Sequence, residues 1–188
     1  MTKKQAIMTS MLIALMLILV FSQKLFDNSF KEVALLDNNL GELQEYSIEK
    51  GNLTFSLPDK WIMNEKESDE YTIYQAEFKD NRNINGYIEV ISTEDDVKAL
   101  AQKDINNLAL SHNEEKIENY KDKNWRGIVV NYKTKVSTGK SFVNNIYYVG
   151  LGDGKVGRFS FIIKENSYKD NMKAIFDTIV STVSSRGK

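Results

Sequence analysis

The sequence of 188 residues contains no cysteine, one proline and one histidine, and each scarcity excludes a class of protein. Without cysteine the chain forms no disulfide and offers no thiol for lipid attachment, so it is not a lipoprotein. A single proline, with no tract rich in proline, glycine or serine, leaves no linker to a second domain. The lone His112 is the only candidate histidine for a transition-metal site or a Ser-His-Asp triad. It lies in a polar segment beside Asn113 and Glu114, where we expect it to be solvated.

The chain also lacks the excess of positive charge that nucleic-acid binding requires. Its formal net charge is −1, and removing Lys3 and Lys4 from the count leaves −3 on the remainder. We therefore expect no nucleic-acid partner.

Charge is missing altogether from residues 5–23, the stretch on which the organisation of the chain depends. At about 1.5 Å rise per residue this stretch spans roughly 28 Å, which nearly matches a bilayer core of about 30 Å. We predict that residues 1–23 form a transmembrane anchor, and a signal peptide cleaved near Ser22 is the alternative. The centre of the stretch is a run of eleven apolar residues: Met11, Leu12, Ile13, Ala14, Leu15, Met16, Leu17, Ile18, Leu19, Val20 and Phe21.

The charges on either side of this run predict its orientation. Lys3 and Lys4 precede it, whereas the lysines that follow alternate with acidic residues. The positive-inside rule then places the N-terminus in the cytoplasm and the rest of the chain outside. We expect a single-pass protein of the cell membrane with the lipid bilayer as one partner, or a secreted protein if the segment is cleaved.

After the anchor the pattern predicts two further segments. Residues 24–45 are expected to form a partly helical tether, because apolar residues recur there at steps of three and four. Residues 46–188 are expected to form one extracytoplasmic domain of ordinary size.

Alternating apolar residues within this domain predict strands. They lie at residues 53–57, 71–78, 87–92, 125–136, 142–151 and 156–163, with a short piece around Ile117. Asn85-Gly86 suits a turn before the third of these strands. On the last strand, Phe159 and Phe161 are expected to face inward, and Arg158 and Ser160 outward.

Two amphipathic helices are predicted from apolar residues at helical spacing. The first follows Thr93, which forms a capping box with Asp96, and the second follows Ser167, with Asp170 three residues on. The fold class is therefore α+β: an antiparallel sheet of about six to seven strands packed with two main helices, preceded by one N-terminal transmembrane helix.

The stretch LTFSLPDKW at residues 53–61 and the final strand and helix, which ends at residues 179–184, are similar to those of the PsbP-like family. The resemblance covers residues 46–185 and implies an α/β sandwich. The family includes photosystem subunits, Ran-binding Mog-type proteins and many small exported bacterial domains. It therefore implies a non-enzymatic interaction module, and it transfers no functional residue to this chain.

Two motifs match catalytic or nucleotide-binding patterns but lack the context that their chemistry needs. Residues 152–157 read G-x-G-x-x-G, yet a strand and not a helix is expected to follow them, so we predict a hairpin turn at Asp153-Gly154. Residues 137–140 read S-x-x-K, the motif that places a serine nucleophile beside a lysine. Because its partner motifs are absent, we predict a turn between two strands there as well.

Acidic and amide clusters give no metal site by sequence. Asn81, Asn83 and Asn85 imitate a calcium loop, but its twelfth position, which needs a glutamate, is Ser92. The acidic residues 94–96 are expected to stabilise the start of a helix. We therefore assign no catalytic, cofactor-binding or metal-binding residue and no cofactor.

Three functional hypotheses follow. The first is a membrane-anchored extracytoplasmic module, not an enzyme, that binds a protein or a cell-envelope component. The second is an exported domain that binds a small apolar ligand or a lipid between sheet and helix, with aromatic residues as its lining. The third is an unrecognised hydrolase. The aromatic residues of the second hypothesis are Tyr71, Tyr74, Trp125, Tyr147 and Tyr148.

Overall fold

The computed structural model describes residues 9, 11–13, 15–16, 41–80, 83–108 and 112–185. The chain divides into two compact units, Met1–Asn39 and Leu40–Lys188. In the first unit residues 11–13 and 15–16 are helical, and their large apolar side chains are exposed. No helix among the described residues is long and apolar enough to cross a membrane. The rest of the predicted anchor and residues 24–40 of the predicted tether lie outside the described residues.

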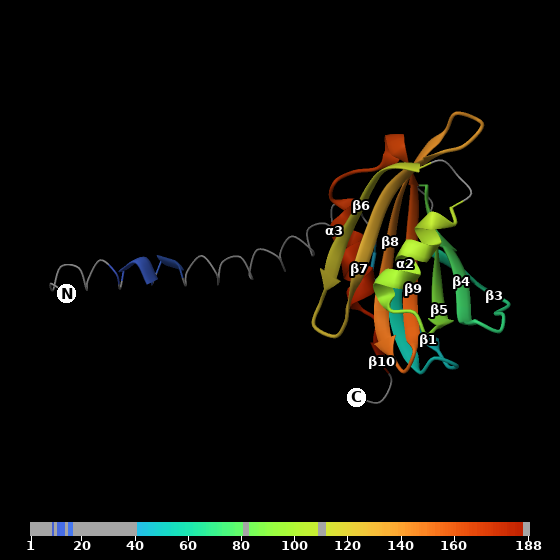
Figure 1. Ribbon diagram of the computed structural model, residues 1–188, viewed down its shortest axis with the longest axis horizontal. Coiled ribbons are helices and arrows are strands. Elements are labelled where there is room, and N and C mark those ends of the chain that lie inside the picture. Colours follow the sequence, from blue (N-terminus) through green and yellow to red (C-terminus); the bar gives the residue numbers. More distant parts are fainter. Residues whose placement is uncertain are drawn as a thin grey trace. The chain divides into compact units, whose positions relative to one another are not determined.

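The second unit contains two antiparallel sheets (Figure 1). The larger has seven strands, in the spatial order β3 (Ile62–Lys66), β4 (Thr72–Lys79), β5 (Ile84–Ser92), β9 (Lys155–Lys164), β8 (Ser141–Gly152), β7 (Arg126–Lys135) and β6 (His112–Lys121). The smaller has three strands, β1 (Leu43–Ile48), β2 (Leu53–Pro58) and β10 (Ser184–Ser185), with β2 in the centre. Two helices, α2 (Val97–Asn106) and α3 (Met172–Ser181), and the 3₁₀ turn η1 (Glu165–Ser167) complete the unit.

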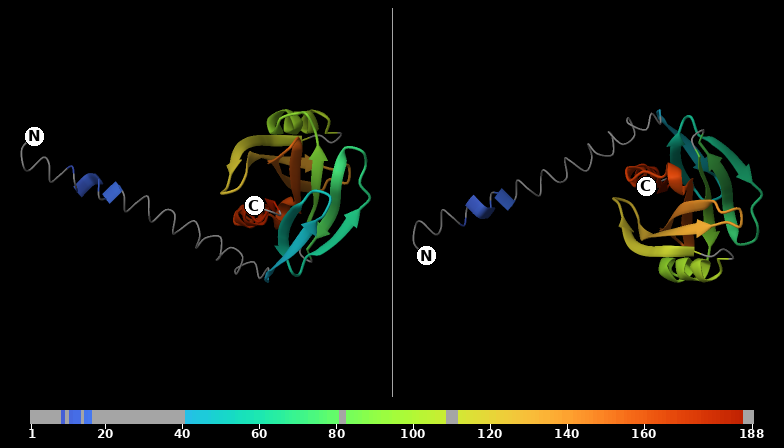
Figure 2. Two further views of the ribbon diagram at one scale, coloured as in Figure 1. Left: turned by 90° about the horizontal axis from the view of Figure 1, so that it is seen from below. Right: turned by 90° about the horizontal axis from the view of Figure 1, so that it is seen from above.

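The helices α2 and α3 lie on opposite faces of the seven-stranded sheet (Figure 2). Side chains of a strand point alternately to its two faces, so the central strand β9 supplies both layers. On one face Phe161 stacks on Phe176 of α3, with ring centroids 4.2 Å apart. On the other face α2 packs on β7 and β8. The α+β class with two main helices is thus confirmed, and the three-stranded sheet is an addition that the sequence pattern did not predict.

Strand β6 is the element that the sequence pattern described least well. We predicted a polar loop at His112 and a short piece around Ile117, whereas residues 112–121 form one ten-residue strand at the edge of the sheet. Charged side chains dominate this strand, as is usual for an edge that must not pair with another chain. Because β6 is polar, a search for alternating apolar residues does not detect it. His112 is partly buried, with Nε2 3.4 Å from the Glu115 carboxylate, so its predicted full solvation is wrong.

Both predicted helix caps are displaced toward the C-terminus. Asp96, and not Thr93, caps α2, because its carboxylate accepts a hydrogen bond of 2.7 Å from the Ala99 N–H. The Thr93 hydroxyl instead accepts from the Asp95 N–H. Helix α3 begins after Asn171, whose side chain makes no capping hydrogen bond, so the cap predicted at Ser167 is wrong.

The turn predicted at Asn85-Gly86 is also wrong, because both residues belong to β5. The chain reverses before them, where Asn83 has a φ of 95° and the Asp80 carboxylate accepts a hydrogen bond from the Ile84 N–H. Glycine is required at position 86 for space. A Cβ atom there would lie 1.9 Å from the Ser160 carbonyl oxygen and 2.4 Å from the Phe78 ring.

We predict that Gly86→Ala lowers the free energy of unfolding by about 3 kcal/mol, because backbone of the neighbouring strand must move to admit the methyl group. Gly150→Ala is the matched control, since its Cβ would meet nothing closer than 3.4 Å. It should cost less than about 1 kcal/mol. Urea denaturation of both variants measures the difference, and equal costs would contradict the close approach at Gly86.

Candidate functional site

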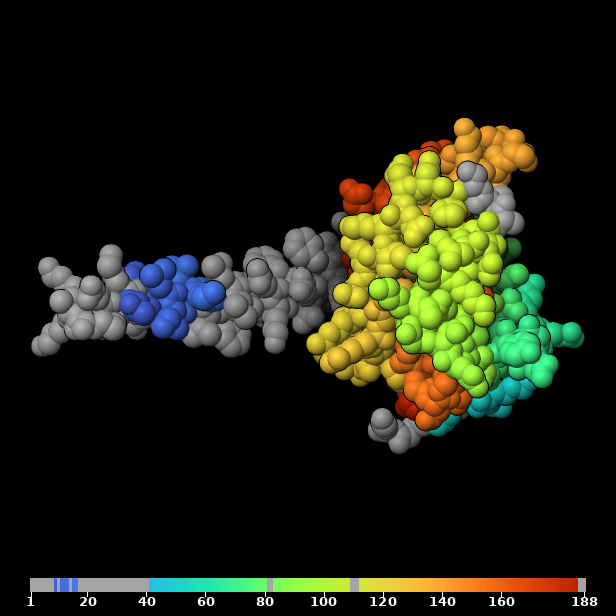
Figure 3. Space-filling model, in the orientation of Figure 1, coloured from blue at the N-terminus to red at the C-terminus, as the bar shows by residue number. Residues whose placement is uncertain are grey.

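Helix α2 is held on the sheet by a short apolar face. Leu100, Ala101 and Ile105 are buried against residues of β7, β8 and β9. Figure 3 shows this side of the domain, with α2 between β6 and the strands β3 and β4. The helix has only ten residues, and Leu108, just after its end, packs against the same apolar cluster.

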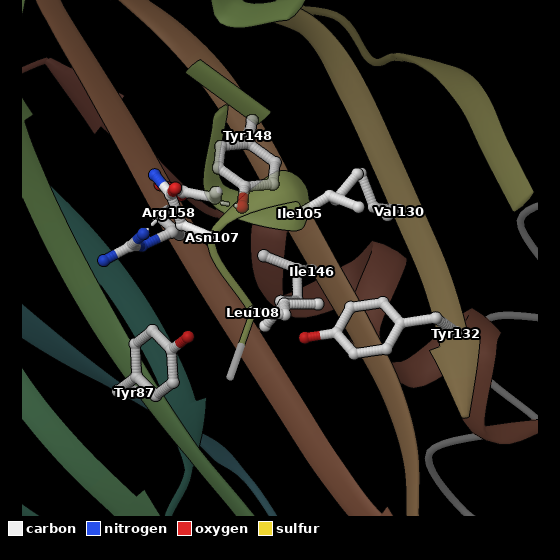
Figure 4. Close-up of a pocket in the computed structure, with 10 residues that line it drawn as sticks. Tyr87, Ile105, Asn107, Leu108, Val130, Tyr132, Ile146, Tyr148 and Arg158 are labelled. Carbon is white, nitrogen blue, oxygen red and sulfur yellow. Dashed lines mark hydrogen bonds and ion pairs between the residues drawn. The ribbon is translucent and has the colours of Figure 1, made fainter. Parts of the chain in front are cut away.

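A pocket of about 150 Å³ lies at the C-terminal end of α2 and is partly open to solvent; we call it the α2 pocket. Its residues come from α2, the segment that follows it and the strands β5, β7, β8 and β9 (Figure 4). Aliphatic side chains and Tyr132 lie on one side of it, and Tyr87 and the ion-paired Arg158 lie on the other (Figure 4). The lining residues are Tyr87, Asp104, Ile105, Asn107, Leu108, Val130, Tyr132, Ile146, Tyr148 and Arg158.

Arg158 of β9 is the charged centre of this site. Its Nε and Nη2 atoms each donate to Oε2 of Glu89 on β5, at 2.6 Å. Its Nη1 atom donates to Oδ2 of Asp104 on α2. The guanidinium carbon also lies 5.6 Å from the ring centroid of Tyr87. Two carboxylates against one guanidinium leave a formal charge of −1 on the cluster.

Tyr148 joins the cluster from β8. Its hydroxyl donates a hydrogen bond of 2.9 Å to Asp104 Oδ2, the same oxygen that Arg158 contacts. Burial and the neighbouring Asp104 carboxylate raise the pKa of Tyr148 well above its usual value. Burial likewise raises the pKa of Tyr132, on the opposite wall, to about 12. Both phenols are therefore neutral donors at physiological pH, and neither is an activated nucleophile.

Ser160 adds a buried hydroxyl next to the pocket. It is fully buried, and its Oγ atom has no hydrogen-bond partner among the described residues. Its partners across the sheet are Tyr87 on β5 and Ile146 on β8, both of which line the α2 pocket. An unpaired buried hydroxyl costs roughly 1–3 kcal/mol. A polar group near this end of the pocket would therefore lower the energy of the site if it bonded Ser160.

A second tyrosine network lies on the opposite face of the sheet. The Tyr147 hydroxyl donates to Asp177 of α3 at 2.8 Å, and Lys173 pairs with the same carboxylate. The Tyr120 hydroxyl donates to Asp122 at 3.0 Å. Burial, together with these carboxylates, raises the pKa of both tyrosines. This network fastens α3 and the β6–β7 turn to the sheet.

The two motifs that match nucleotide-binding and catalytic patterns, at residues 152–157 and 137–140, occupy turns, as predicted. Asp153 and Gly154 connect β8 to β9 with positive φ angles of 51° and 66°, so G-x-G-x-x-G is a hairpin. The S-x-x-K residues connect β7 to β8, where the Val136 N–H donates to the Lys140 carbonyl. Asn81 of the imitated calcium loop lies outside the described residues, and among those described no three His, Cys, Asp or Glu side chains could hold a metal.

The five aromatic residues named for an apolar pocket do not share one. Tyr147 and Tyr148 are adjacent on β8 and point to opposite faces, and of the five only Tyr148 lines the α2 pocket. Tyr71 is 68% exposed. The Trp125 indole donates to the Val183 carbonyl at 2.7 Å, away from α2.

The charged cluster itself was not recognised from the sequence. We expected Arg158 and Ser160 to point outward to solvent, whereas both lie beneath or beside α2 and its following segment. The feature that could have revealed the cluster is the pair of opposite charges Glu89 and Arg158, which lie directly across from each other on neighbouring strands. That pairing becomes visible only when β5 and β9 are known to be neighbours, and they are separated by 62 residues of chain.

Fold and site together define a class: an α+β sandwich with a small pocket of mixed aliphatic, aromatic and charged lining at the end of one helix. No protein-family model matches the sequence, and no curated protein matches it. Among solved structures, cyanobacterial PsbP (CyanoP) from Synechocystis sp. PCC 6803 is similar, with 18% identity, a TM-score of 0.55 and coverage of 77% of this chain and 93% of that one.

The Ran-binding protein Mog1p of Saccharomyces cerevisiae is similar as well, with 10% identity and a TM-score of 0.52. The match covers 78% of this chain and 96% of that one. An E65A mutant of Mog1 matches with a TM-score of 0.54 and 12% identity over 77% of this chain and 96% of that one. The chain therefore has the PsbP-like fold, as its resemblance to the family implied.

We predict that stability declines above about pH 10, where tyrosines of the unfolded chain ionise. Tyr120, Tyr132, Tyr147 and Tyr148 have raised pKa values when folded, so the unfolded state releases these protons first. Their contribution is complete below about pH 10 and falls by up to about 1.4 kcal/mol per pH unit for each tyrosine above it.

Urea titrations between about pH 9 and about pH 11.5, with tyrosinate absorbance followed in parallel, measure this decline. Tyr148→Phe should reduce the slope, because it removes one of the ionising hydroxyls. Titration of all four hydroxyls near pH 10 in the folded protein, without loss of stability, would contradict the prediction.

Proposed function

We propose that the protein is a membrane-anchored interaction module, without catalytic activity, that binds a protein or a cell-envelope component outside the cytoplasm. The observation that carries the proposal is the uncharged stretch at residues 5–23. In its described part, large apolar side chains are exposed by 53–70% on a helix: Met11, Leu12, Ile13, Leu15 and Met16. Exposed apolar surface of this kind requires a membrane or a partner to cover it.

The proposed orientation has the N-terminus in the cytoplasm and the PsbP-like domain outside. The support is Lys3 and Lys4, the only charges before the apolar run. An uncleaved anchor keeps the domain at the membrane, whereas cleavage near Ser22 releases it.

The site chemistry supports binding in preference to catalysis. Glu89 and Asp104 both pair with Arg158, and the Tyr148 phenol is a neutral donor. A general base or nucleophile must exchange a proton near neutral pH, and the raised pKa values of Tyr132 and Tyr148 exclude these two phenols from that role. The PsbP-like fold of a Ran-binding protein, Mog1p, supports a protein partner for this chain as well.

The volume of the α2 pocket disfavours the lipid-binding alternative. Sites for small molecules commonly enclose about 300–1,000 Å³, whereas the α2 pocket has about 150 Å³. A larger and more open hollow of about 420 Å³ near the β7–β8 turn is lined by residues that include Lys140, Lys164 and Glu165.

We predict that the full chain stays in the membrane pellet after alkaline carbonate extraction. The double variant Leu15→Lys, Leu17→Lys should leave the pellet, because each lysine at the centre of a spanning helix costs about 3 kcal/mol. The double variant with alanine at the same two positions should remain. Recovery of a soluble mature chain that begins at Gln23 would instead establish cleavage and contradict the anchor.

We also predict that crosslinking in intact cells, from the outside, joins the domain to a defined protein or envelope component. The double lysine variant should lose this product if membrane attachment positions the domain beside its partner.

Protease added outside should digest the domain in intact cells. Protection from that protease, or the absence of any enriched crosslinked species, would count against the proposal.

A further inference from the structure

We propose that the α2 pocket is a binding site for a small organic cation, an alkylammonium or guanidinium group. Size sets the first limit. A cavity of about 150 Å³ holds a benzene-sized molecule of about six non-hydrogen atoms, and the α2 pocket has about 150 Å³. Because the pocket is partly open, such a group can enter without unfolding α2.

Charge selects a cation over an anion. Arg158 is the cluster's only cation, and all three of its guanidinium nitrogens already donate to carboxylates. The cluster keeps a formal charge of −1, so an added anion would meet repulsion from both Glu89 and Asp104. Asp104 lines the pocket, and its Oδ1 atom accepts no hydrogen bond from the described residues. This oxygen is therefore available to an N–H donor.

Aromatic rings give the cation its second contact. Figure 4 shows Tyr87, Tyr132 and Tyr148 around the space next to Ile146 and Leu108. A cation over a tyrosine face is stabilised by the ring quadrupole. The site already contains one such contact, because the Arg158 guanidinium lies 5.6 Å from the centroid of Tyr87. The Tyr132 ring meets the His112 ring edge to face, with centroids 5.8 Å apart, and the Tyr148 ring has no cation contact among the described residues.

Ser160 supplies an independent observation. Its unpartnered, fully buried hydroxyl belongs to the same face of the sheet, between Tyr87 and Ile146. A hydroxyl oxygen accepts hydrogen bonds as readily as it donates them. Ser160 does not itself line the pocket, so an ammonium or guanidinium N–H satisfies this hydroxyl only by passing between these two lining residues, and an apolar ligand does not satisfy it at all.

The cationic group has two possible sources: a free small molecule, or a lysine or arginine side chain of a protein partner. Only the second source rests on the proposed function. The pocket is tested on the purified full chain in a nonionic detergent, with no partner present. Failure of the pocket and failure of the membrane or crosslinking experiments are therefore distinguishable.

The test is an NMR titration of the backbone amides of Asn107, Ile146 and Arg158 at constant ionic strength. The probes are tetramethylammonium, n-butylammonium and methylguanidinium chlorides, with neutral tert-butanol and sodium acetate for comparison. We expect each cation to shift these amides saturably with a Kd on the order of 1 mM. Affinity for tert-butanol and acetate should be about tenfold weaker or less. Equal affinity for tert-butanol, tighter binding of acetate, or no saturation by any cation would overturn the proposal.

Matched variants locate the effect in the α2 pocket. Asp104→Asn should weaken cation binding about tenfold, and Asp95→Asn, at an exposed carboxylate beside the start of the same helix, should not change it. If Asp104→Asn does not fold, Tyr132→Leu against Tyr132→Phe decides, because only leucine removes the aromatic face. Unchanged affinity in Tyr132→Leu or in a folded Asp104→Asn would overturn the site.

The two sources are separated by a short peptide with one lysine, compared with the same peptide carrying norleucine. Binding of the lysine peptide about tenfold tighter than n-butylammonium would assign the pocket to a partner's side chain. Similar affinities would assign it to free cations. Equal binding of the norleucine peptide would overturn recognition by charge.

Discussion

The packing of this domain depends on one strand, β9, that is buried on both of its faces. Phe159, Phe161 and Ile163 fill the layer under α3, whereas Val156, Arg158 and Ser160 fill the layer under α2. In a central strand that is covered on both faces, every side chain points to one face or the other, because backbone geometry fixes the alternation. Strand β9 contributes aromatic rings to the layer under α3 and an arginine to the layer under α2. The contacts of Glu89, Asp104 and Tyr148 are arranged around that arginine.

This constraint explains where the sequence was informative. Strong alternation or helical periodicity predicted the strands β2, β4, β5, β7, β8 and β9 and both helices, because each of these elements buries at least one apolar face. Edges were harder to predict. Strand β6 is charged along its length, β10 has two residues, and β1 is mostly exposed, so hydrophobic pattern carries little information about them. The class of fold could be predicted from the buried elements, whereas the three-stranded sheet could not be predicted.

The site was beyond the reach of sequence pattern for a different physical reason. Glu89, Asp104 and Arg158 come from a strand, a helix and a second strand that are far apart in the chain. Each looks like an ordinary surface charge in its own segment. Gly86 was similarly misread, because its neighbours in sequence suggest a turn, while its neighbours in space are Phe78 and Ser160. Contacts across a sheet decided both cases, and strand order must be known before they can be inferred.

The ion cluster also restricts how this protein can change over evolutionary time. Replacing Arg158 alone leaves two carboxylates without their cation in a partly buried place, which commonly costs several kcal/mol. Replacing all three with well-packed apolar residues is often neutral or favourable. The two carboxylates therefore depend on position 158. Divergent relatives that lack the arginine should lack both carboxylates as well, whereas relatives that keep it need only one of them.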